Sequence, residues 1–286
     1  MALDLVLYGA FAAGFVAGRL TRWRSPWVGR AAAGTVGLLL FLLGVSLGRL
    51  DLSAVQSEVP LAVAFAVLTL VLTLVVARIL APRPPISTPS PRLGRASFLT
   101  PLLFVFAVVL GVLVGHSAGV NPGPSTEYVL YALLVLVGFD LTIDPKRLRS
   151  AWAAIASAVV GGFAVGALFV GLGLVPAGAS FATAGAFGWY SLAGPLVAGR
   201  LGASLGLFAF LANFLRENLT MLAAPWAGPR VGGSGLAAMG GATSMDTTLY
   251  FATRYGGEGA GTIALATGVV LTLVAGLVVP VLLLLP

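Results

Sequence analysis

Apolar stretches of about 20 residues follow one another along this chain, with only short polar connections between them. A helix of roughly that length crosses the hydrocarbon core of a bilayer, so we expect about eight transmembrane helices. Of the 286 residues, 59% are hydrophobic and 9% are charged, which leaves too little polar surface to cover a water-soluble globule. The sequence therefore predicts an all-α integral membrane protein. The expected spans are Leu3 to Leu20, Ala31 to Leu50, Val59 to Leu80, Phe98 to Ser117, Tyr128 to Ile143, Ala151 to Gly173, Ala203 to Trp226 and Ala260 to Leu285.

The charged residues between these stretches alternate in sign from loop to loop. Basic residues fill every second loop, and the intervening loops carry acids with Arg49 as their one base. The positive-inside rule places the basic loops in the cytoplasm and both chain termini outside. This distribution explains the net charge of +7 without a nucleic-acid partner. The basic loop residues are Arg19, Arg22, Arg24 and Arg30, then Arg78, Arg83, Arg92 and Arg95, then Lys146, Arg147 and Arg149; the opposing acids are Asp51, Glu58 and Glu127.

A segment rich in Pro, Ser and Arg, "APRPPISTPSPRLGRAS" at 81–97, predicts a cytoplasmic linker. It separates a three-helix unit at 1–80 from a second three-helix unit at 98–173, and a transport core is expected at 174–286. The end of the second span, "LFLLGVSL", and the end of the fifth, "LVLVGFDL", both combine a Gly with a polar residue two positions later. Three crossings separate them, so a duplication here would be an inverted repeat.

The last third of the chain contains a clearer repeat. Ala184 to Ala212 aligns with Met239 to Thr267, and each copy runs from a Gly-rich entry through a polar centre to a long apolar helix. The Gly-rich parts, 181–199 and 234–252, either span the membrane or re-enter from one face. Two arms of nine residues would reach about mid-membrane, so length favours re-entrant or discontinuous segments, although the basic residues do not decide between the two arrangements.

The second of these segments reads "GGATSMDTTLYF" and places Asp246 in apolar surroundings. Non-helical backbone at membrane depth needs protein or water around it, so this stretch is expected to line a cavity, with Thr243, Ser244, Thr247 and Thr248 bonding freed backbone amides. A carboxylate there needs a cation or a proton as partner. The alternative is that Asp246 only caps a half-helix.

A polar stripe on the seventh span is expected to front the same cavity. Asn213, Glu217 and Thr220 stand at i, i+4 and i+7 and therefore share one helix face. Arg216 points away from Glu217, and we expect it to pair with an acid elsewhere or to extend towards the membrane surface. The alternative is a packing interface in which the two charges neutralise other neighbours.

Two aromatic residues and two further acids complete the candidate site. Trp189 and Tyr190 could place aromatic faces against a cationic amine, or could form an interfacial belt pair. Asp140 and Asp51 both end their helices; Asp140 lies deeper and is the better intramembrane acid, whereas Asp51 could be a solvated loop residue.

No metal or cofactor is expected, because the chain has no Cys and a single His.

Three strings carry a family resemblance: "GAFGWYSLAG" at 185–194, "NFLRE" at 213–217 and "GATSMDTTL" at 241–249. In this order and spacing the sequence resembles the L-lysine exporter family LysO, which comprises DUF340-like membrane proteins. The string "LFLLGVSLGRLDL" at 40–52 is also similar to the N-terminal region of that family.

The resemblance implies an eight-span protein of a prokaryotic plasma (inner) membrane, with both termini outside, that exports L-lysine and the toxic analogue thialysine. Two acids regarded as essential in the family correspond by motif to Asp246 and Asp51. The string "GFD" at 138–140 departs from the family, which has an uncharged polar residue there, so Asp140 inherits no role from the resemblance.

The expected mechanism is antiport of lysine against a proton, with Na⁺ as the other candidate coupling ion. Asp246 would alternate between a proton and the substrate ammonium, Glu217 would be the second acid, and Ser191 or the half-helix N-termini would hold the substrate carboxylate. Another cationic amino acid is an alternative substrate, and a homodimer is an open option.

Two other classes of protein fit the sequence less well than a carrier. Asp140 and Asp246 are two membrane acids, as an intramembrane aspartyl protease requires, but the Gly-x-Gly-Asp string typical of such enzymes is absent. A channel is less consistent with paired broken segments than a carrier with alternating access. The sequence therefore predicts a secondary transporter and not an enzyme.

Overall fold

A computed structural model describes residues 2–21, 26–49, 58–80, 95–118, 122, 124–141 and 144–286, and in these residues helix is the regular secondary structure. The contacts divide the chain into two units: unit 1 is Met1–Asp51 with Pro89–Ile143, and unit 2 is Leu52–Thr88 with Asp144–Pro286. This grouping differs from the two three-helix units and separate core expected from the sequence. The third helix of each expected unit packs instead within unit 2, because the two pack against each other and against the core helices.

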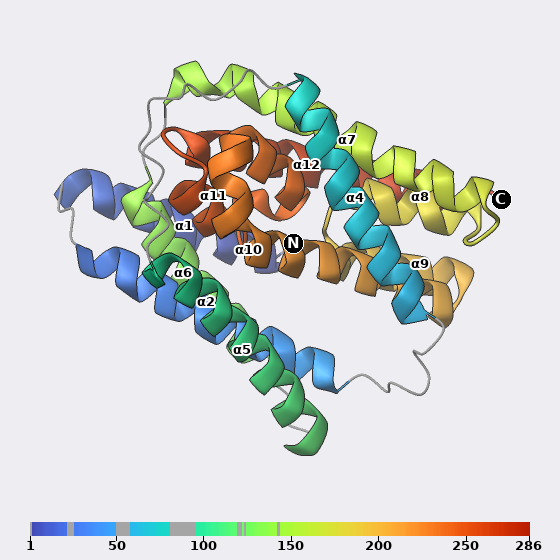
Figure 1. Cartoon of the computed structure of the whole chain (residues 1–286), viewed down its shortest axis with the longest axis horizontal. Coiled ribbons are helices and arrows are strands. Elements are labelled where there is room, and N and C mark those ends of the chain that lie inside the picture. The colour runs from blue at the N-terminus through green and yellow to red at the C-terminus, as the bar shows by residue number, and fades with distance from the viewer. Residues whose placement is uncertain are drawn as a thin grey trace. The chain divides into compact units, whose positions relative to one another are not determined.

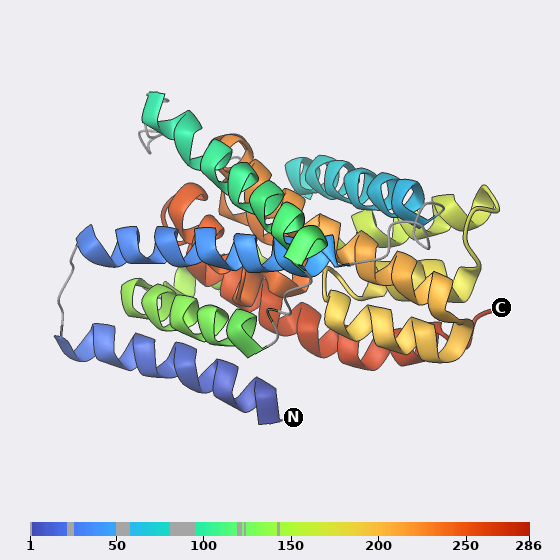
Figure 2. The same cartoon turned by 90° about the horizontal axis from the view of Figure 1, so that it is seen from below.

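Unit 1 consists of four helices: α1 (Ala2–Thr21), α2 (Pro26–Gly48), α5 (Arg95–Ala118) and α6 (Pro124–Asp140). Helix α6 packs between α1 and α2, and α5 packs against α2 (Figure 2). Asp51 lies outside the described residues, and the side chain of Asp140 at the end of α6 is likewise outside them.

Small residues let α2 and α5 approach closely. Gly44 and Gly48 on α2 face Gly111 and Gly115 on α5, so that two Gly-x-x-x-Gly strings lie against each other. A Cβ atom built on Gly111 would lie 3.0 Å from the Cα of Gly44, and one on Gly44 would also press on α5 backbone. Close backbone approach of this kind is a common way to join helices in a membrane, where lipid removes the hydrophobic drive between them.

Unit 2 holds the remaining helices, and α10 is the longest of them. Gly232, with φ 66° and ψ −172°, is non-helical inside α10 and divides it into a long arm at 203–231 and a short arm at 233–240. A residue with a side chain would be strained at this φ. The helices of unit 2 are α4 (Glu58–Leu80), η1 (Pro145–Arg147), α7 (Leu148–Gly171), α8 (Ala177–Gly185), α9 (Tyr190–Leu201), α10 (Ala203–Gly240), η2 (Gly241–Met245), α11 (Leu249–Tyr255) and α12 (Ala260–Leu282) (Figure 1).

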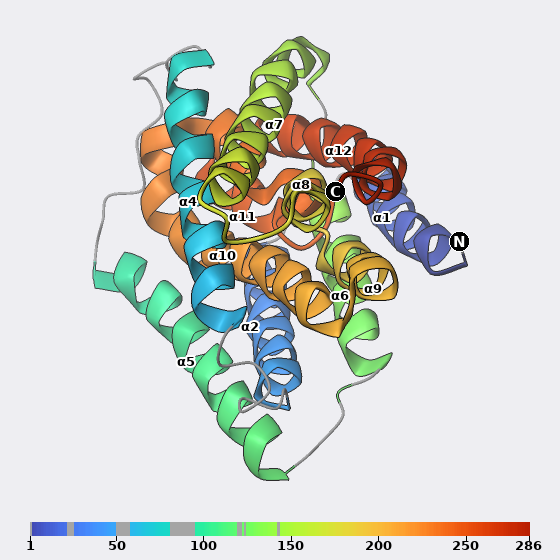
Figure 3. The ribbon, with the colours of Figure 1, turned by 90° about the vertical axis from the view of Figure 1, so that its right-hand side faces the viewer.

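The first Gly-rich segment folds as a helical hairpin made of α8 and α9, here called hairpin 1. A Cβ atom on Gly178, at the start of α8, would lie 3.4 Å from Cδ1 of Leu201, at the end of α9. Both ends of the segment are therefore adjacent, and residues 186–189 form its tip. Figure 3 shows α8 surrounded by α7, α12, α9 and α10, all of which contact it.

The second Gly-rich segment forms hairpin 2, made of the short arm of α10, η2 and α11. A Cβ atom on Gly256, just after α11, would lie 3.0 Å from the Cα of Gly233, where the short arm begins. Residues 241–248 form the tip. The long arm of α10 joins the base of hairpin 1 to the base of hairpin 2 and is about 40 Å long at 1.5 Å per residue. The two hairpins therefore enter unit 2 from opposite ends.

Helices α7 and α12 also run between these two ends. The backbone N–H of Asp144, just before α7, donates to Oγ1 of Thr262 in the first turn of α12 (3.0 Å). At the other end the N–H of Gly178 donates to the carbonyl of Pro286 (3.4 Å), so the C-terminus lies beside hairpin 1 (Figure 1). Long helices thus enclose the hairpins and position their tips.

Among the described residues, three helical stretches are long and apolar enough to cross a membrane: Glu58–Leu80, Pro145–Gly171 and Ala260–Leu282. The long arm of α10 has the length but carries polar residues such as Arg216 and Glu217. The total of about eight spans stays a prediction. Shorter apolar helical stretches are Arg30–Val45, Phe106–Ala118 and Tyr128–Phe139.

Candidate functional site

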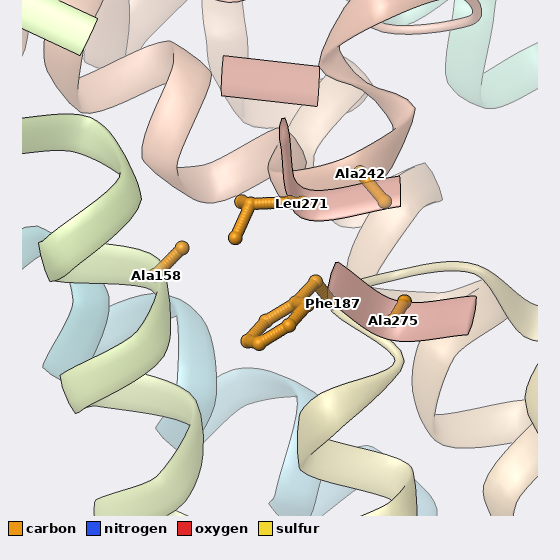
Figure 4. Packing of buried hydrophobic residues seen from close by; sticks show 5 residues of the cluster. All are labelled: Ala158, Phe187, Ala242, Leu271 and Ala275. Carbon is orange, nitrogen blue, oxygen red and sulfur yellow. The ribbon is translucent and has the colours of Figure 1, made fainter. Parts of the chain in front are cut away.

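The tips of the two hairpins are joined by a backbone hydrogen bond. The N–H of Ala242 in hairpin 2 donates to the carbonyl of Phe187 in hairpin 1 (2.9 Å). Phe187 has φ 51° and is the non-Gly residue with positive φ in the described part of the chain. Such strained backbone persists only where the surroundings fix it. Here its ring is fully buried in an apolar cluster with Ala158, Ala242, Leu271 and Ala275 (Figure 4).

Gly241 makes this contact between the tips sterically feasible. Its φ is 63°, and a Cβ atom on it would overlap the carbonyl of Phe187 and lie 3.0 Å from Nη2 of Arg216. The backbone conformation and the lack of space both require Gly at this position.

Asn213, on the long arm of α10, fixes the tip of hairpin 1. Its Oδ1 accepts from the N–H of Gly188 (2.8 Å), and its Nδ2 donates to the carbonyls of Thr183 (3.1 Å) and Ala209 (3.0 Å). The side chain is 2% exposed, so these bonds satisfy an amide that has little other access to partners. Asn213 was expected to face a cavity. In the structure its side-chain amide bonds backbone groups of hairpin 1 and of its own helix.

Arg216, one turn later on the same arm, fixes the end of the short arm in hairpin 2. Its Nε donates to the carbonyl of Met239 (3.1 Å) and its Nη2 to that of Ala238 (3.0 Å). These carbonyls belong to the last turn of a helix, where a positive charge also complements the helix dipole. Arg216 therefore neither pairs with an acid nor extends to the membrane surface, as had been expected, because the broken helix supplies free carbonyls nearer by.

The hydroxyl groups at the tip of hairpin 2 also bond carbonyls and not the freed amides that were expected. Oγ1 of Thr243 donates to Gly240 O (3.0 Å), Oγ of Ser244 to Ala264 O on α12 (2.8 Å), and Oγ1 of Thr248 to Thr243 O (3.0 Å). These hydroxyl groups link the tip of hairpin 2 to the end of the short arm, to α12 and to a carbonyl within the tip itself. Thr243 and Ser244 thus stabilise the tip.

Two carboxylates lie next to each other beside this tip. Glu217 on the long arm of α10 is 1% exposed, whereas Asp246 in the tip of hairpin 2 is partly exposed, and the charge of Asp246 acts on Glu217. The N–H and Oγ1 of Thr247 donate to Oδ1 of Asp246 (2.6 and 3.2 Å), and the Thr247 side chain also lies beside Glu217. Oε1 of Glu217 is buried with no hydrogen-bond partner among the described residues.

The phenol of Tyr190 lies within electrostatic range of both carboxylates. The Tyr190 ring packs edge-on against Phe210 (5.3 Å between centroids) and Phe214 (5.4 Å) on the long arm of α10, which fixes its position. Trp189 points to a different neighbourhood and packs against the apolar cluster around Phe187. Tyr190 is therefore the aromatic residue of the acidic site, and Trp189 is a packing residue.

The two carboxylates have no basic partner in the part of the chain that the structure describes. No ion pair joins Glu217 or Asp246 to an Arg or Lys there, and the guanidinium of Arg216 is occupied by backbone carbonyls. The described residues also contain no group of three or more His, Asp or Glu that could hold a metal ion. The arrangement instead offers two carboxylates and a phenol to a small cation.

The structure brings together only part of the site expected from the sequence. Glu217, Asp246 and Tyr190 meet, while Ser191 is exposed and has no contact with the acids among the described interactions. The roles of Phe210 and Phe214 in holding Tyr190 were not expected from the sequence. Their spacing was the available signal, because they precede Glu217 by seven and three residues and so lie on nearly the same helix face.

These features define a helical membrane protein with a pair of neighbouring carboxylates beside the junction of two helical hairpins. The chain belongs to the lysine exporter LysO family, whose sequence model matches residues 102–283 and therefore includes the whole acidic site. This is a family of exporters and not of enzymes. The similar strings at 40–52 lie outside the matched range.

One curated relative is the lysine exporter LysO of Escherichia coli (strain K12). It is 30% identical over 185 residues, a match that covers 60% of this chain. The chain spans about 60% of the length of that relative. No solved structure matches the chain.

Proposed function

We propose that this chain exports L-lysine and that the carboxylates of Asp246 and Glu217 together form the site at which its side-chain ammonium group and a proton are exchanged. The observation that carries the proposal is the pair of carboxylates, one buried and one partly exposed, without a basic partner among the described residues. Buried anions at membrane depth need a cation nearby, and a transported ammonium group can be that cation. The exporter named among the relatives supports lysine as the substrate, and thialysine carries the same ammonium group.

Coupling to a proton would make this export energetically feasible. Moving one positive charge out of a cell against the membrane potential costs about 2.3 kcal/mol per 100 mV. If one proton enters for each lysine cation that leaves, the charge movements cancel and the pH gradient drives export. A carboxylate pair suits this exchange, because it can bind either a proton or an ammonium group.

The two hairpins suggest how the site could open to each side in turn. Hairpin 1 is followed by the long arm of α10, hairpin 2 is followed by α12, and the hairpins enter from opposite ends. Inverted repeats with broken helices that meet at a central site are typical of secondary transporters. We infer that movement of these two repeats relative to each other exposes the acidic site alternately.

The charges at the two ends of unit 2 favour one orientation in the membrane. Oγ of Ser204 donates to Oε1 of Glu58 (2.5 Å), so α4 begins at the base of hairpin 1, where Arg200 is the nearby base. The base of hairpin 2 is much more basic, which supports a cytoplasmic position for that end in a prokaryotic cell, with hairpin 1 and the C-terminus outside. The basic residues of that end are Arg78, Lys146, Arg147, Arg149, Arg230 and Arg254.

The test is transport of labelled lysine by the purified protein in liposomes under imposed gradients of pH, Na⁺ or potential. We expect saturable, pH-driven flux that exchanges with unlabelled lysine, and we expect Asp246→Asn to abolish it. Competition by arginine and ornithine measures substrate selectivity. Glu258→Gln is the matched control, because Glu258 is exposed at the base of hairpin 2. Unchanged pH-driven export by Asp246→Asn would refute the proposed site, and flux that rises linearly with substrate would indicate a channel.

A further inference from the structure

The two carboxylates of the site differ in how they can be reached. Asp246 is partly exposed, whereas Glu217 is 1% exposed and is enclosed by the helices that pack on α10. An ammonium group on a flexible side chain needs space for its three hydrogens and the last carbon atoms. Such a group meets accessible surface at Asp246, whereas Oε1 of Glu217 is buried and offers it none.

The two carboxylates also differ in their hydrogen bonds, and this difference likewise favours a proton on Glu217. Asp246 has the N–H and Oγ1 of Thr247 as donors to Oδ1, at 2.6 and 3.2 Å. Oε1 of Glu217 has no donor at all among the described residues. A buried acceptor without a donor is destabilising, and a proton bound to that oxygen removes the deficit.

Among the described residues, no fixed positive charge beside Glu217 compensates this deficit. The groups that act on it are Asp246 and Thr247 from hairpin 2, and its charge in turn acts on Tyr190 from α9. Arg216, its neighbour on α10, binds carbonyls of the short arm. The other charged residues on the described helices that pack against the long arm lie near helix ends: Glu58, Arg78, Arg149, Arg200 and Arg254.

We propose that Glu217 carries the coupling proton while Asp246 binds the ammonium group of the substrate. This inference rests on the proposed exchange of lysine for a proton, and it moves the proton from Asp246, the residue suggested by sequence, to its buried neighbour. The coupling follows from proximity: an ammonium group at Asp246 repels a proton on Glu217 across the short distance at which the two carboxylates interact. Lysine binding and proton release are therefore linked.

The test separates exchange from gradient-driven export in liposomes. Exchange of internal labelled lysine for external unlabelled lysine needs no net proton movement, whereas export driven by a pH gradient does. We expect Glu217→Gln to keep exchange and lose pH-driven export, and Asp246→Asn to lose both. Glu258→Gln should retain both activities. A Glu217→Gln protein that exports with wild-type response to the pH gradient, or that loses exchange as Asp246→Asn does, overturns the assignment.

If Glu217→Gln is inactive in liposomes, a binding measurement still tests the proposal. When lysine is added to detergent-solubilised protein in weakly buffered solution, a pH-indicator dye should report proton release from the wild type and from Glu258→Gln. Glu217→Gln should bind lysine, as measured by calorimetry, without releasing protons; proton release equal to that of the wild type refutes the proposal. The wild type is measured first in liposomes, and its failure to respond to a pH gradient would refute the proposed proton exchange separately from the role of Glu217.

Discussion

The backbone N–H of Ala242 donates a hydrogen bond of 2.9 Å to the carbonyl of Phe187, and this bond joins the tips of two hairpins that enter from opposite ends of unit 2. Both residues lie in helix breaks, where backbone groups lack helical partners. Pairing the two breaks satisfies part of this deficit inside the protein, which is a requirement for irregular backbone within a membrane. Arg216 holds the same hairpin, which carries Asp246, against the long arm that carries Glu217.

Replacing Tyr190 by Phe should affect binding more than stability. The ring would keep its edge-on contacts with Phe210 and Phe214, and only the hydroxyl near the two carboxylates would be lost. If the phenol helps to bind the ammonium group or the acids, we expect the KM for lysine to rise about tenfold, since a hydrogen bond to a charged group contributes about 1.5 kcal/mol. Transport assays and thermal melting in detergent measure the two effects. Tyr128→Phe, at an exposed site, is the control, and an unchanged KM would argue against a role for the hydroxyl.

Replacing Arg216 by Gln or by Lys should lower the stability of the protein. Its Nε and Nη2 bind two successive carbonyls, and a Lys ammonium is a single point that does not reproduce this fork. Each lost bond to a charged group costs about 1.5 to 3 kcal/mol. We expect a lower melting temperature for Arg216→Lys and a still lower one for Arg216→Gln, with export reduced in the same order. Arg200→Lys, at an exposed position, provides the baseline, and a wild-type melting temperature for Arg216→Gln would contradict the structural role.

Gly241→Ala should separate the two tips. The added methyl group would overlap the carbonyl of Phe187 in a backbone conformation with φ 63°. Strain of this kind costs about 1 to 3 kcal/mol, and the displaced tip carries Asp246, so both the melting temperature and lysine transport should fall. Gly276→Ala is the matched control on α12, because a Cβ atom there would meet nothing within 4 Å. Equal behaviour of the two variants would mean that the contact between the tips is dispensable.

The proposed orientation can be tested with single cysteines, since the natural chain contains none. Glu258 is exposed at the base of hairpin 2, and Leu284 is 70% exposed near the C-terminus. In intact cells a membrane-impermeant maleimide should label Leu284→Cys and spare Glu258→Cys, which should react only after permeabilisation. The reverse pattern would invert the orientation inferred from the basic residues.

Several features of the site were predictable because they depend on local composition. Asp246 stands out as an acid in an apolar, Gly-rich segment, and the aligned copies at 184–212 and 239–267 indicated two related broken segments. Glu217 was found through its helical spacing from Asn213. These inferences need no knowledge of the packing, because hydropathy and periodicity act within one element.

Other features depended on partners far away in the chain. Trp189 and Tyr190 are neighbours in sequence, yet one packs on an apolar cluster and the other approaches the acids, because the helix begins between them and turns their side chains apart. Arg216 finds its partners 22 and 23 residues later, at carbonyls that become available only because the short arm ends there. No sequence pattern near Arg216 indicates that its side chain binds these carbonyls.

The sequence by itself determined that this chain is an all-helical membrane protein with two polar interruptions, because the transfer of about 20 apolar residues into lipid is a property of each segment alone. Only the tertiary structure decided that the interruptions meet at Phe187 and Ala242 and that Glu217 is enclosed beside Asp246. Those contacts result from how long helices pack around two hairpins, and the energy of such packing belongs to pairs of distant segments and not to any one of them.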